Sequence, residues 1–357
     1  MLELIFAFFA LLGAIDKIAG NKFRLGAAFE KGLMTAGPLI LSMAGMIVLS
    51  PVLADALSGL LVPLCGKVGI DPSVLSGFFP VDAGGASMAY NLSDDAQMRA
   101  YHGIVVASML GATICPAIPL SLQMTDKKIH PDVLTGLLCG IATIPLGCIA
   151  AGLVIGCAVL PLLINTIPLL LISGLICWGL LKKPQFVVRL FGWIGKILMA
   201  FVLLGLLVGM LAQFGDIHIF QNAAPLSDAF VIIGNIAVIL AGVFPLLEMI
   251  SRLLKKPMAA LAKTMGVTDS TVLGFVTNLA NSIPVFSMME DMDKKGRVLN
   301  MAFAVSAGYV LGDHLAFILS YDRSFAVPMV LGKLIGGIAA VALGLLICKK
   351  QQNKTSP

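Results

Sequence analysis

The fold class follows from stretches such as residues 193–214, which read WIGKILMAFVLLGLLVGMLAQF. This stretch holds one charged residue, Lys196, among almost entirely apolar or small side chains. As a helix, about 20 such residues cross the roughly 30 Å hydrocarbon core of a bilayer. Similar runs recur along the chain, which is typical of a membrane protein with several spans.

The composition of the whole chain excludes an ordinary soluble protein. Of its 357 residues, 59% are hydrophobic and 12% are charged, and the mean hydropathy is +0.99. A soluble domain carries about 25% charged residues. The net charge of +5 comes from short basic clusters between apolar runs, a pattern typical of membrane proteins. We therefore expect lipid around the chain and no nucleic-acid partner.

We predict an all-α polytopic membrane protein with about nine transmembrane helices. Two further apolar stretches, residues 71–92 and 268–289, are interrupted near the middle by Gly, Pro, Asn or Asp. We interpret them as re-entrant or broken segments, which occur at membrane depth only where protein or a wet cavity surrounds them. The predicted spans are residues 2–15, 35–60, 101–122, 132–158, 161–181, 193–214, 228–251, 298–320 and 326–348.

The distribution of Lys and Arg predicts the topology. If both broken segments return to the side from which they enter, one side holds only Lys67, Arg99 and Arg323. The other side holds all the remaining Lys and Arg residues except Lys333, which lies within a span. Because basic residues concentrate in cytoplasmic loops, the second side is predicted to be cytoplasmic. The C-terminus is then inside and the N-terminus outside.

The two halves of the chain resemble each other. Residues 68–78 (VGIDPSVLSGF) align with residues 265–275 (MGVTDSTVLGF), and in both halves one long span precedes the broken segment and two spans follow it. Since the two broken segments enter from opposite sides, we predict an inverted repeat, in which the binding site lies near the bilayer midplane. The predicted parts are a first repeat at 1–160, a linking span and loop at 161–192, a second repeat at 193–348 and a tail at 349–357.

The first broken segment contains SGFFPVDAGGAS at residues 76–87. Asp82 lies at the break, and a carboxylate at membrane depth costs about 2.5–3.5 kcal/mol, so such a residue usually has a task. We predict that Asp82 binds substrate; the alternative is an Asp in a loop at the outer interface. Gly84 and Gly85 allow the chain to turn close to a ligand. Phe78 and Ser87 flank the break and complete this half of the predicted site.

The second broken segment contains TNLANSIPVF at residues 277–286. Asn278 and Asn281 carry amides, which both donate and accept hydrogen bonds and so suit a hydroxyl or amine ligand. The alternative role, compatible with the first, is to cap the ends of the half-helices. Pro284 is predicted to be structural, and Phe286 to face the ligand.

An acid and an imidazole are adjacent in the next predicted span, at Asp313 and His314. Neighbouring helix positions point about 100° apart, so one of them is expected to face the cavity while the other supports it. The alternatives are a buried ion pair, or a titrating His that couples transport to protons. Lys333 could neutralise Asp82 or Asp313, or extend its side chain to the outer surface. His102, His130 and His218 lie near predicted span ends and are expected to be solvated.

Several chemistries are not indicated by the sequence. The seven Cys residues form no CxxC pair and lie mostly in apolar runs, which suggests packing rather than disulfides or metal ligands. The Asp313-His314 pair has no HxxxH or Cys cluster beside it, so we predict no metal site. We find no P-loop, GxGxxG turn or nucleophile elbow. The chain is therefore expected to be no enzyme and to need no cofactor.

The sequence resembles the ethanolamine utilisation permease family over nearly its whole length. The resemblance is densest from residue 277 to 337. Two departures are the short links near 160 and 216–226 and an unexpected acid at Asp55. The matching motifs are FEKG at 29–32, GM at 45–46, SPVLA at 50–54, Asp82 with Gly84-Gly85, TIPLGCIA at 143–150, LANSIP at 279–284, AFAVSA at 302–307, GDHL at 312–315 and GKLIGG at 332–337.

This resemblance implies a multi-pass protein of the bacterial inner membrane that takes up ethanolamine, by facilitated diffusion or secondary transport. The ammonium of ethanolamine needs a carboxylate or an aromatic face, and its hydroxyl needs an amide or Ser. The predicted substrate-binding residues offer this set. The alternatives are a transporter of another small amine, or a transporter-like sensor or scaffold without flux. A homodimer is compatible with the sequence.

Overall fold

The structure is a computed structural model that describes residues 2–253, 257, 260, 262–264 and 266–355. These residues form helices joined by turns, with no strand among them. Lys255, Lys256 and Met265, which entered the charge count and the repeat alignment, lie outside the described residues. The all-α prediction is confirmed for the part of the chain described.

Seven helical segments of the described chain are long and apolar enough to cross a membrane. They coincide with seven of the nine predicted spans, and they make the chain a multi-pass membrane protein. The segments are residues 25–68, 96–123, 127–155, 159–182, 184–215, 226–253 and 323–351.

The other two predicted spans are not among these seven, although α1 (Leu2–Ile18) is an apolar helix of 17 residues. Residues 2–15 belong to α1, which packs against α2 (Leu25–Met34) and α11 (Leu226–Leu253). Residues 298–320 are not one helix but two, α15 (Lys294–Ala307) and α16 (Asp313–Tyr321), separated by a non-helical link. The count of nine continuous spans is thus not reproduced.

The first long segment, residues 25–68, is helical throughout but irregular. It runs from α2 through α3 (Ala36–Leu39) and a π-helical turn at Ile40–Ala44 into α4 (Gly45–Val68). Asp16 anchors the preceding turn, because its carboxylate accepts hydrogen bonds from the backbone N–H groups of Phe23 and Gly26 at 2.9 and 3.0 Å.

The second long segment is also kinked. It consists of α6 (Ala96–Ala100), a π-helix at Tyr101–Gly111, a distorted turn at Thr113–Ala117 and α7 (Ile118–Gln123). The distortion falls at Cys115, whose φ and ψ are non-helical, just before Pro116. Proline removes a backbone donor and clashes with the preceding turn, which explains the kink.

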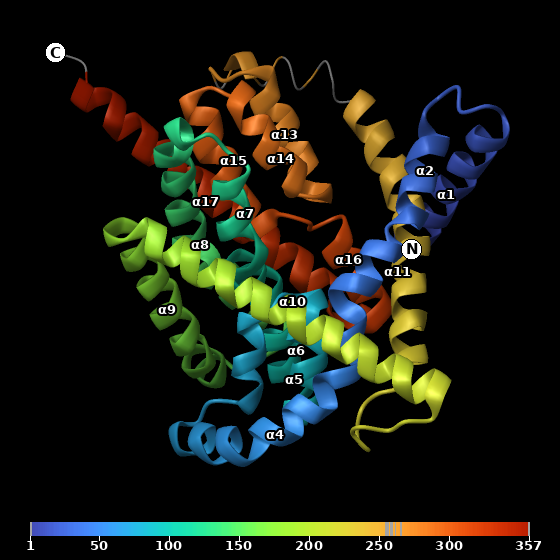
Figure 1. Ribbon diagram of the computed structural model, residues 1–357. Helices are drawn as coiled ribbons and strands as arrows, with labels where there is room; N and C mark the ends of the chain where they lie inside the picture. The colour runs from blue at the N-terminus through green and yellow to red at the C-terminus, as the bar shows by residue number, and fades with distance from the viewer. Residues whose placement is uncertain (1, 254–256, 258–259, 261, 265, 356–357) are drawn as a thin grey trace.

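Both predicted broken segments are broken in the structure. The first comprises a 3₁₀ helix (Pro72–Phe78), an extended link, a π-helical turn (Val81–Gly85) and α5 (Ala86–Leu92). The second comprises α13 (Asp269–Ala280) and α14 (Ile283–Met288), which flank a break at residues 281–282. The two segments lie at opposite ends of the molecule, with α13 and α14 at the top of Figure 1 and α5 near the bottom.

Small residues bring the central helices together. α8 (His130–Ile155) packs along α17 (Ala326–Thr355) and α15. A Cβ on Gly147 would lie 2.4 Å from the carbonyl oxygen of Gly332, and one on Gly136 would lie 2.6 Å from Cβ of Met301. Such close approach is how helices associate in a membrane, where the hydrophobic effect between them is absent.

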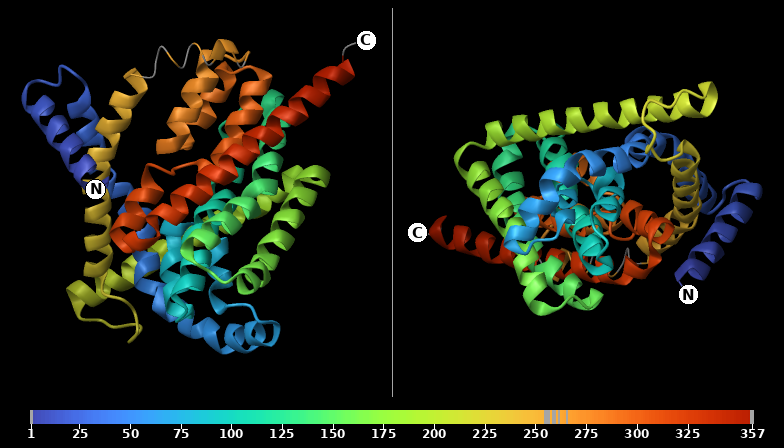
Figure 2. Two further views of the ribbon diagram at one scale, coloured as in Figure 1. Left: turned by 180° about the vertical axis from the view of Figure 1, so that it is seen from behind. Right: turned by 90° about the horizontal axis from the view of Figure 1, so that it is seen from below.

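The long helices α9 (Val159–Lys182) and α10 (Pro184–Gly215) lie on the periphery (Figure 2, right). Many of their apolar side chains are exposed, including Leu171, Trp178 and Leu204. Exposed apolar surface of this extent is expected where lipid is the solvent.

Candidate functional site

The break in the second segment is built by Asn281. Its backbone is extended, and its side-chain Oδ1 accepts a 2.9 Å hydrogen bond from the N–H of Ile283 at the start of α14. Asx side chains commonly cap a helix start in this way. Pro284 occupies the first turn of α14, where its missing N–H costs nothing. The capping role left open for Asn281 is therefore observed in the structure.

The link between α15 and α16 lies against this break. The N–H of Tyr309 donates to the carbonyl oxygen of Asn278, and that of Leu311 donates to the carbonyl oxygen of Leu279, both at 2.8 Å. A Cβ on Gly312 would lie 1.9 Å from the carbonyl oxygen of Ala280, so only Gly permits this approach. Backbone pairing with α13 thus replaces the helical bonds expected for a continuous span at 298–320.

Asp313 begins α16 at the end of that link. The Nδ2 of Asn281 donates a 3.3 Å hydrogen bond to its Oδ2. The pair is thus assembled from two segments that are each interrupted, and the peptide dipoles at the start of α16 favour a carboxylate there.

Asn281 and Asp313 line a cavity of about 680 Å³ between α2, α11 and the second broken segment. Lys31, Arg24 and Glu248 also line it, and Glu248 is ion-paired with Arg252 at 2.6 Å. Pro284 lies on the same wall. Lys31 and Glu248 line the cavity without any sequence signal for it, because nothing in the sequence places α2 and α11 beside α13.

Asp82 occupies the break in the first segment. Ala83 and Gly84 after it have non-helical backbone, and Gly84 has φ +115°, a conformation that favours glycine. A Cβ on Gly85 would lie 2.6 Å from Cβ of Ala107 and 2.9 Å from the carbonyl oxygen of Phe79. Gly84 thus permits the turn itself, and Gly85 permits the close packing of this turn against Ala107 and Phe79.

Lys333 is buried, with 1% of its surface exposed. Its ammonium donates a 2.6 Å hydrogen bond to the carbonyl oxygen of Ser108 in the π-helix 101–111. It therefore does not extend to the outer surface. Asp82 interacts electrostatically with Lys333 of α17 and with Asp313 of α16, but no ion pair joins it to Lys333 among the described residues.

Several other predicted site residues are buried and lie away from this cavity. Asn278 is fully buried and donates to Asn300 at 3.3 Å. Phe286 is fully buried in an apolar cluster that Phe78 adjoins. Ser87 is buried, and its hydroxyl donates to the carbonyl oxygen of Gly84 at 3.5 Å. These side chains support the breaks and do not line the 680 Å³ cavity.

His314 is buried and stacks on Tyr309, with ring centroids 5.1 Å apart. Its Nδ1 has no hydrogen-bond partner among the described residues. Asp313 and His314 thus diverge, with Asp313 lining the cavity and His314 turned into the protein. The divergence agrees with helix geometry, but His314 neither lines this cavity nor makes, through Nδ1, the supporting hydrogen bond that was expected of the second residue.

His102 was expected to be solvated and is not. It is 1% exposed, and its Nδ1 lies 2.9 Å from the hydroxyl of Ser73 in the first broken segment. Ser73 also donates to Asp71. The expectation for His102 was wrong because the π-helix that carries it packs against the broken segment, a tertiary contact without a local sequence signal.

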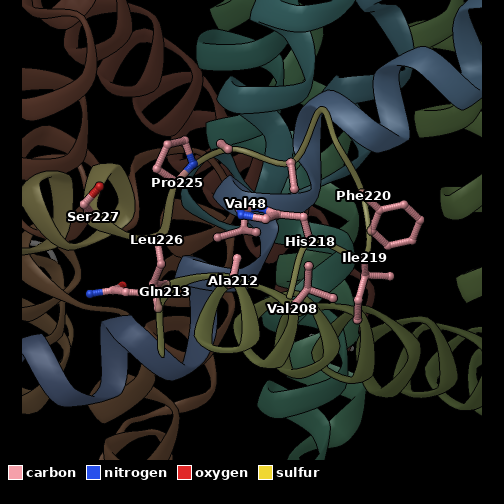
Figure 3. A pocket seen from close by; sticks show the side chains of 13 residues that line it. Val48, Val208, Ala212, Gln213, His218, Ile219, Phe220, Pro225, Leu226 and Ser227 are labelled. Carbon is pink, nitrogen blue, oxygen red and sulfur yellow. The ribbon is translucent and has the colours of Figure 1, made fainter. Parts of the chain in front are cut away.

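A second cavity, of about 320 Å³, lies beneath the loop that joins α10 to α11. Figure 3 shows Val208, Ala212 and Gln213 of α10 and Pro225 and Leu226 around it. None of the predicted site residues lines this cavity. We therefore place the candidate site at the 680 Å³ cavity and the two breaks.

Comparison with known proteins identifies the family. Residues 1–347 match the family model described as ethanolamine utilisation protein, EutH. The chain is 40% identical to the probable ethanolamine permease EutH of Listeria monocytogenes, over 97% of this chain and 93% of the relative. It is 32% identical to the probable ethanolamine permease EutH of Escherichia coli, over 97% of this chain and 95% of the relative.

A further relative, the uncharacterized protein YxeR of Bacillus subtilis, is 34% identical over 98% of this chain and 95% of its own length. No solved structure matches the chain. The resemblance found in the sequence is thus confirmed, and the chain belongs to the EutH family of ethanolamine utilisation proteins.

Proposed function

We propose that this protein takes up ethanolamine across the bacterial inner membrane and catalyses no reaction. The observation that carries the proposal is the cavity lined by Asn281 and Asp313, together with the electrostatic interaction of Asp313 with Asp82. Family membership and the names of the relatives support ethanolamine as the substrate.

The site chemistry fits ethanolamine in its ammonium form. The ammonium would bind the carboxylate of Asp313 on the cavity side and then that of Asp82, while the hydroxyl would exchange hydrogen bonds with the amide of Asn281. A charge-assisted hydrogen bond to a carboxylate is about twice as strong as a neutral one. Lys333 would hold the charge of Asp82 when substrate is absent.

The proposed architecture is an inverted repeat with the binding site near the midplane. Its support is the break in each half and the placement of the two broken segments at opposite ends of the molecule (Figure 1). The C-terminal end of α17 lies on the same side of the molecule as α13 (Figure 1), the side that the charge count predicts to be cytoplasmic. The cavity lined by Lys31 and Arg24 would then open to the cytoplasm.

Uptake of labelled ethanolamine into proteoliposomes tests the proposal. We expect saturable uptake of the labelled ethanolamine. An excess of unlabelled ethanolamine should abolish this uptake, whereas larger amines should inhibit it only weakly. Absence of uptake in folded, reconstituted protein would favour a sensor or scaffold. Equal competition by other small amines would move the substrate assignment to one of them. Imposed proton and sodium gradients, compared with none, would show the driving force.

A further inference from the structure

A third cavity, of about 750 Å³, is a groove on the outside of the molecule between α7, the start of α8 and the first part of α10. Three cationic side chains line it: Lys127, Arg189 and Lys196. No Asp or Glu is among its lining residues. The chain has 19 acidic residues, but the charged side chains that line this groove are all positive. This lining favours an anionic ligand.

The charges of the three groove cations are not neutralised by acidic side chains of the described chain. None of the three forms an ion pair among the described residues, and all three are exposed. The nearby acids in sequence are engaged elsewhere, since Asp126 caps the turn at Lys127–Ile129 and Asp132 pairs with Arg297 at 3.2 Å. The groove thus offers its charge to something outside the chain.

The position of the groove along α10 places it at the membrane interface. Residues 197–215 contain no charged residue and, as a helix, come close to crossing the hydrocarbon core alone. Residues 184–196, which carry Arg189 and Lys196, therefore extend into the headgroup region. The charge count predicts Lys127 to be cytoplasmic, so the groove would face the inner leaflet.

The remaining lining residues suit an amphiphile. Trp193 is 60% exposed, and the ammonium of Lys196 lies 5.3 Å from its ring centroid; Trp concentrates at membrane interfaces. Leu122, Leu134 and Val188 supply apolar wall. An inorganic phosphate would use the cations and leave this wall unoccupied, whereas a phospholipid would use both.

We infer that this groove binds the headgroup of an anionic phospholipid from the cytoplasmic leaflet. The phosphate would lie between Lys127, Arg189 and Lys196, with the glycerol against Trp193 and the acyl chains along the exposed face of α10. Basic pockets between membrane helices on this side bind such headgroups. Since α10 and α7 both contribute, the lipid would hold the peripheral helix against the kinked segment 96–123.

Native mass spectrometry of the full-length protein in detergent tests the inference, with phosphatidylglycerol and phosphatidylcholine as probes. We expect the protein to retain one phosphatidylglycerol at least about tenfold more readily than phosphatidylcholine. The variant K127Q/R189Q/K196Q should lose that preference. The matched control K22Q/K128Q/K349Q removes the same charge from outside the groove and should keep it.

Three outcomes would overturn the inference. The native protein could retain both lipids equally, or the groove variant could retain phosphatidylglycerol as well as the native protein does. Inorganic phosphate could also raise the melting temperature of the native protein as much as phosphatidylglycerol does. If the triple variant does not fold, Arg189→Gln alone should weaken retention several-fold. A salt titration of the native protein should also weaken it, because screening acts on exposed charges. Indifference to both changes would equally rule out the proposed site.

Discussion

The amide of Asn281 donates a 3.3 Å hydrogen bond to the carboxylate of Asp313, although 32 residues separate them in the chain. Asn281 simultaneously caps α14 through its Oδ1. One side chain therefore fixes the break in the second segment and orients the acid at the end of the 680 Å³ cavity. This double role makes the pair a direct target for experiment.

Replacing Asp313 with Asn is predicted to lower ethanolamine uptake by at least about tenfold, because the change removes the charge and preserves the shape. Uptake into proteoliposomes, normalised to folded protein, measures the effect. Asp228→Asn is the matched control, since Asp228 is exposed at the start of α11, away from the cavity. Comparable uptake by the two variants would show that Asp313 does not bind the substrate.

Asp82 and Lys333 are predicted to balance each other's charge. Asp82→Asn should abolish or strongly weaken uptake while expression persists. Lys333→Gln should reduce folded yield, because it leaves the carboxylate without its cation in a low-dielectric setting. The double variant D82N/K333Q should recover yield but not uptake.

Size-exclusion chromatography of detergent-solubilised protein measures yield, and proteoliposomes measure uptake. Normal uptake by Asp82→Asn would reassign Asp82 to a structural turn. A double variant with lower yield than Lys333→Gln alone would refute the charge pairing.

His314→Gln is predicted to reduce uptake partially and to change its pH dependence. The substitution keeps hydrogen-bonding capacity and removes a group that in water titrates near neutrality. Because His314 is buried against Tyr309, some of the loss should come from the disturbed stack. Uptake is measured between about pH 5.5 and 8. A wild-type profile in this variant would eliminate proton coupling through His314.

Gly45→Ala is predicted to lower the free energy of unfolding in detergent by about 1–3 kcal/mol, a cost typical of overpacking. The change is measured as a lower melting temperature. A Cβ on Gly45 would lie 1.7 Å from the carbonyl oxygen of Val202 on α10. Gly59→Ala on the same helix is the control, since nothing lies within 4 Å of its Cβ position. It should be neutral or slightly stabilising, because Ala favours a helix over Gly. Equal melting temperatures for the two variants would contradict the close crossing of α4 and α10.

Local sequence patterns were enough to predict the membrane class, seven of the spans and both broken segments. Long apolar runs have few alternatives to a membrane helix, and the Pro, Gly and Asn residues at 80–85 and 278–284 act on their own local backbone. The same reasoning located Asp82 at a break and separated Asp313 from His314 by helix geometry. These features depend on interactions within a few residues.

The way in which those parts meet depends on tertiary contacts. The link between α15 and α16 is non-helical because its N–H groups pair with Asn278 and Leu279, a bond pattern that residues 298–320 do not encode locally. The Asn281–Asp313 hydrogen bond and the contact of Lys333 with Ser108 likewise join residues distant in the chain. Buried polar groups form hydrogen bonds with whichever partners the packing places beside them. Sequence periodicity therefore could not predict these partners.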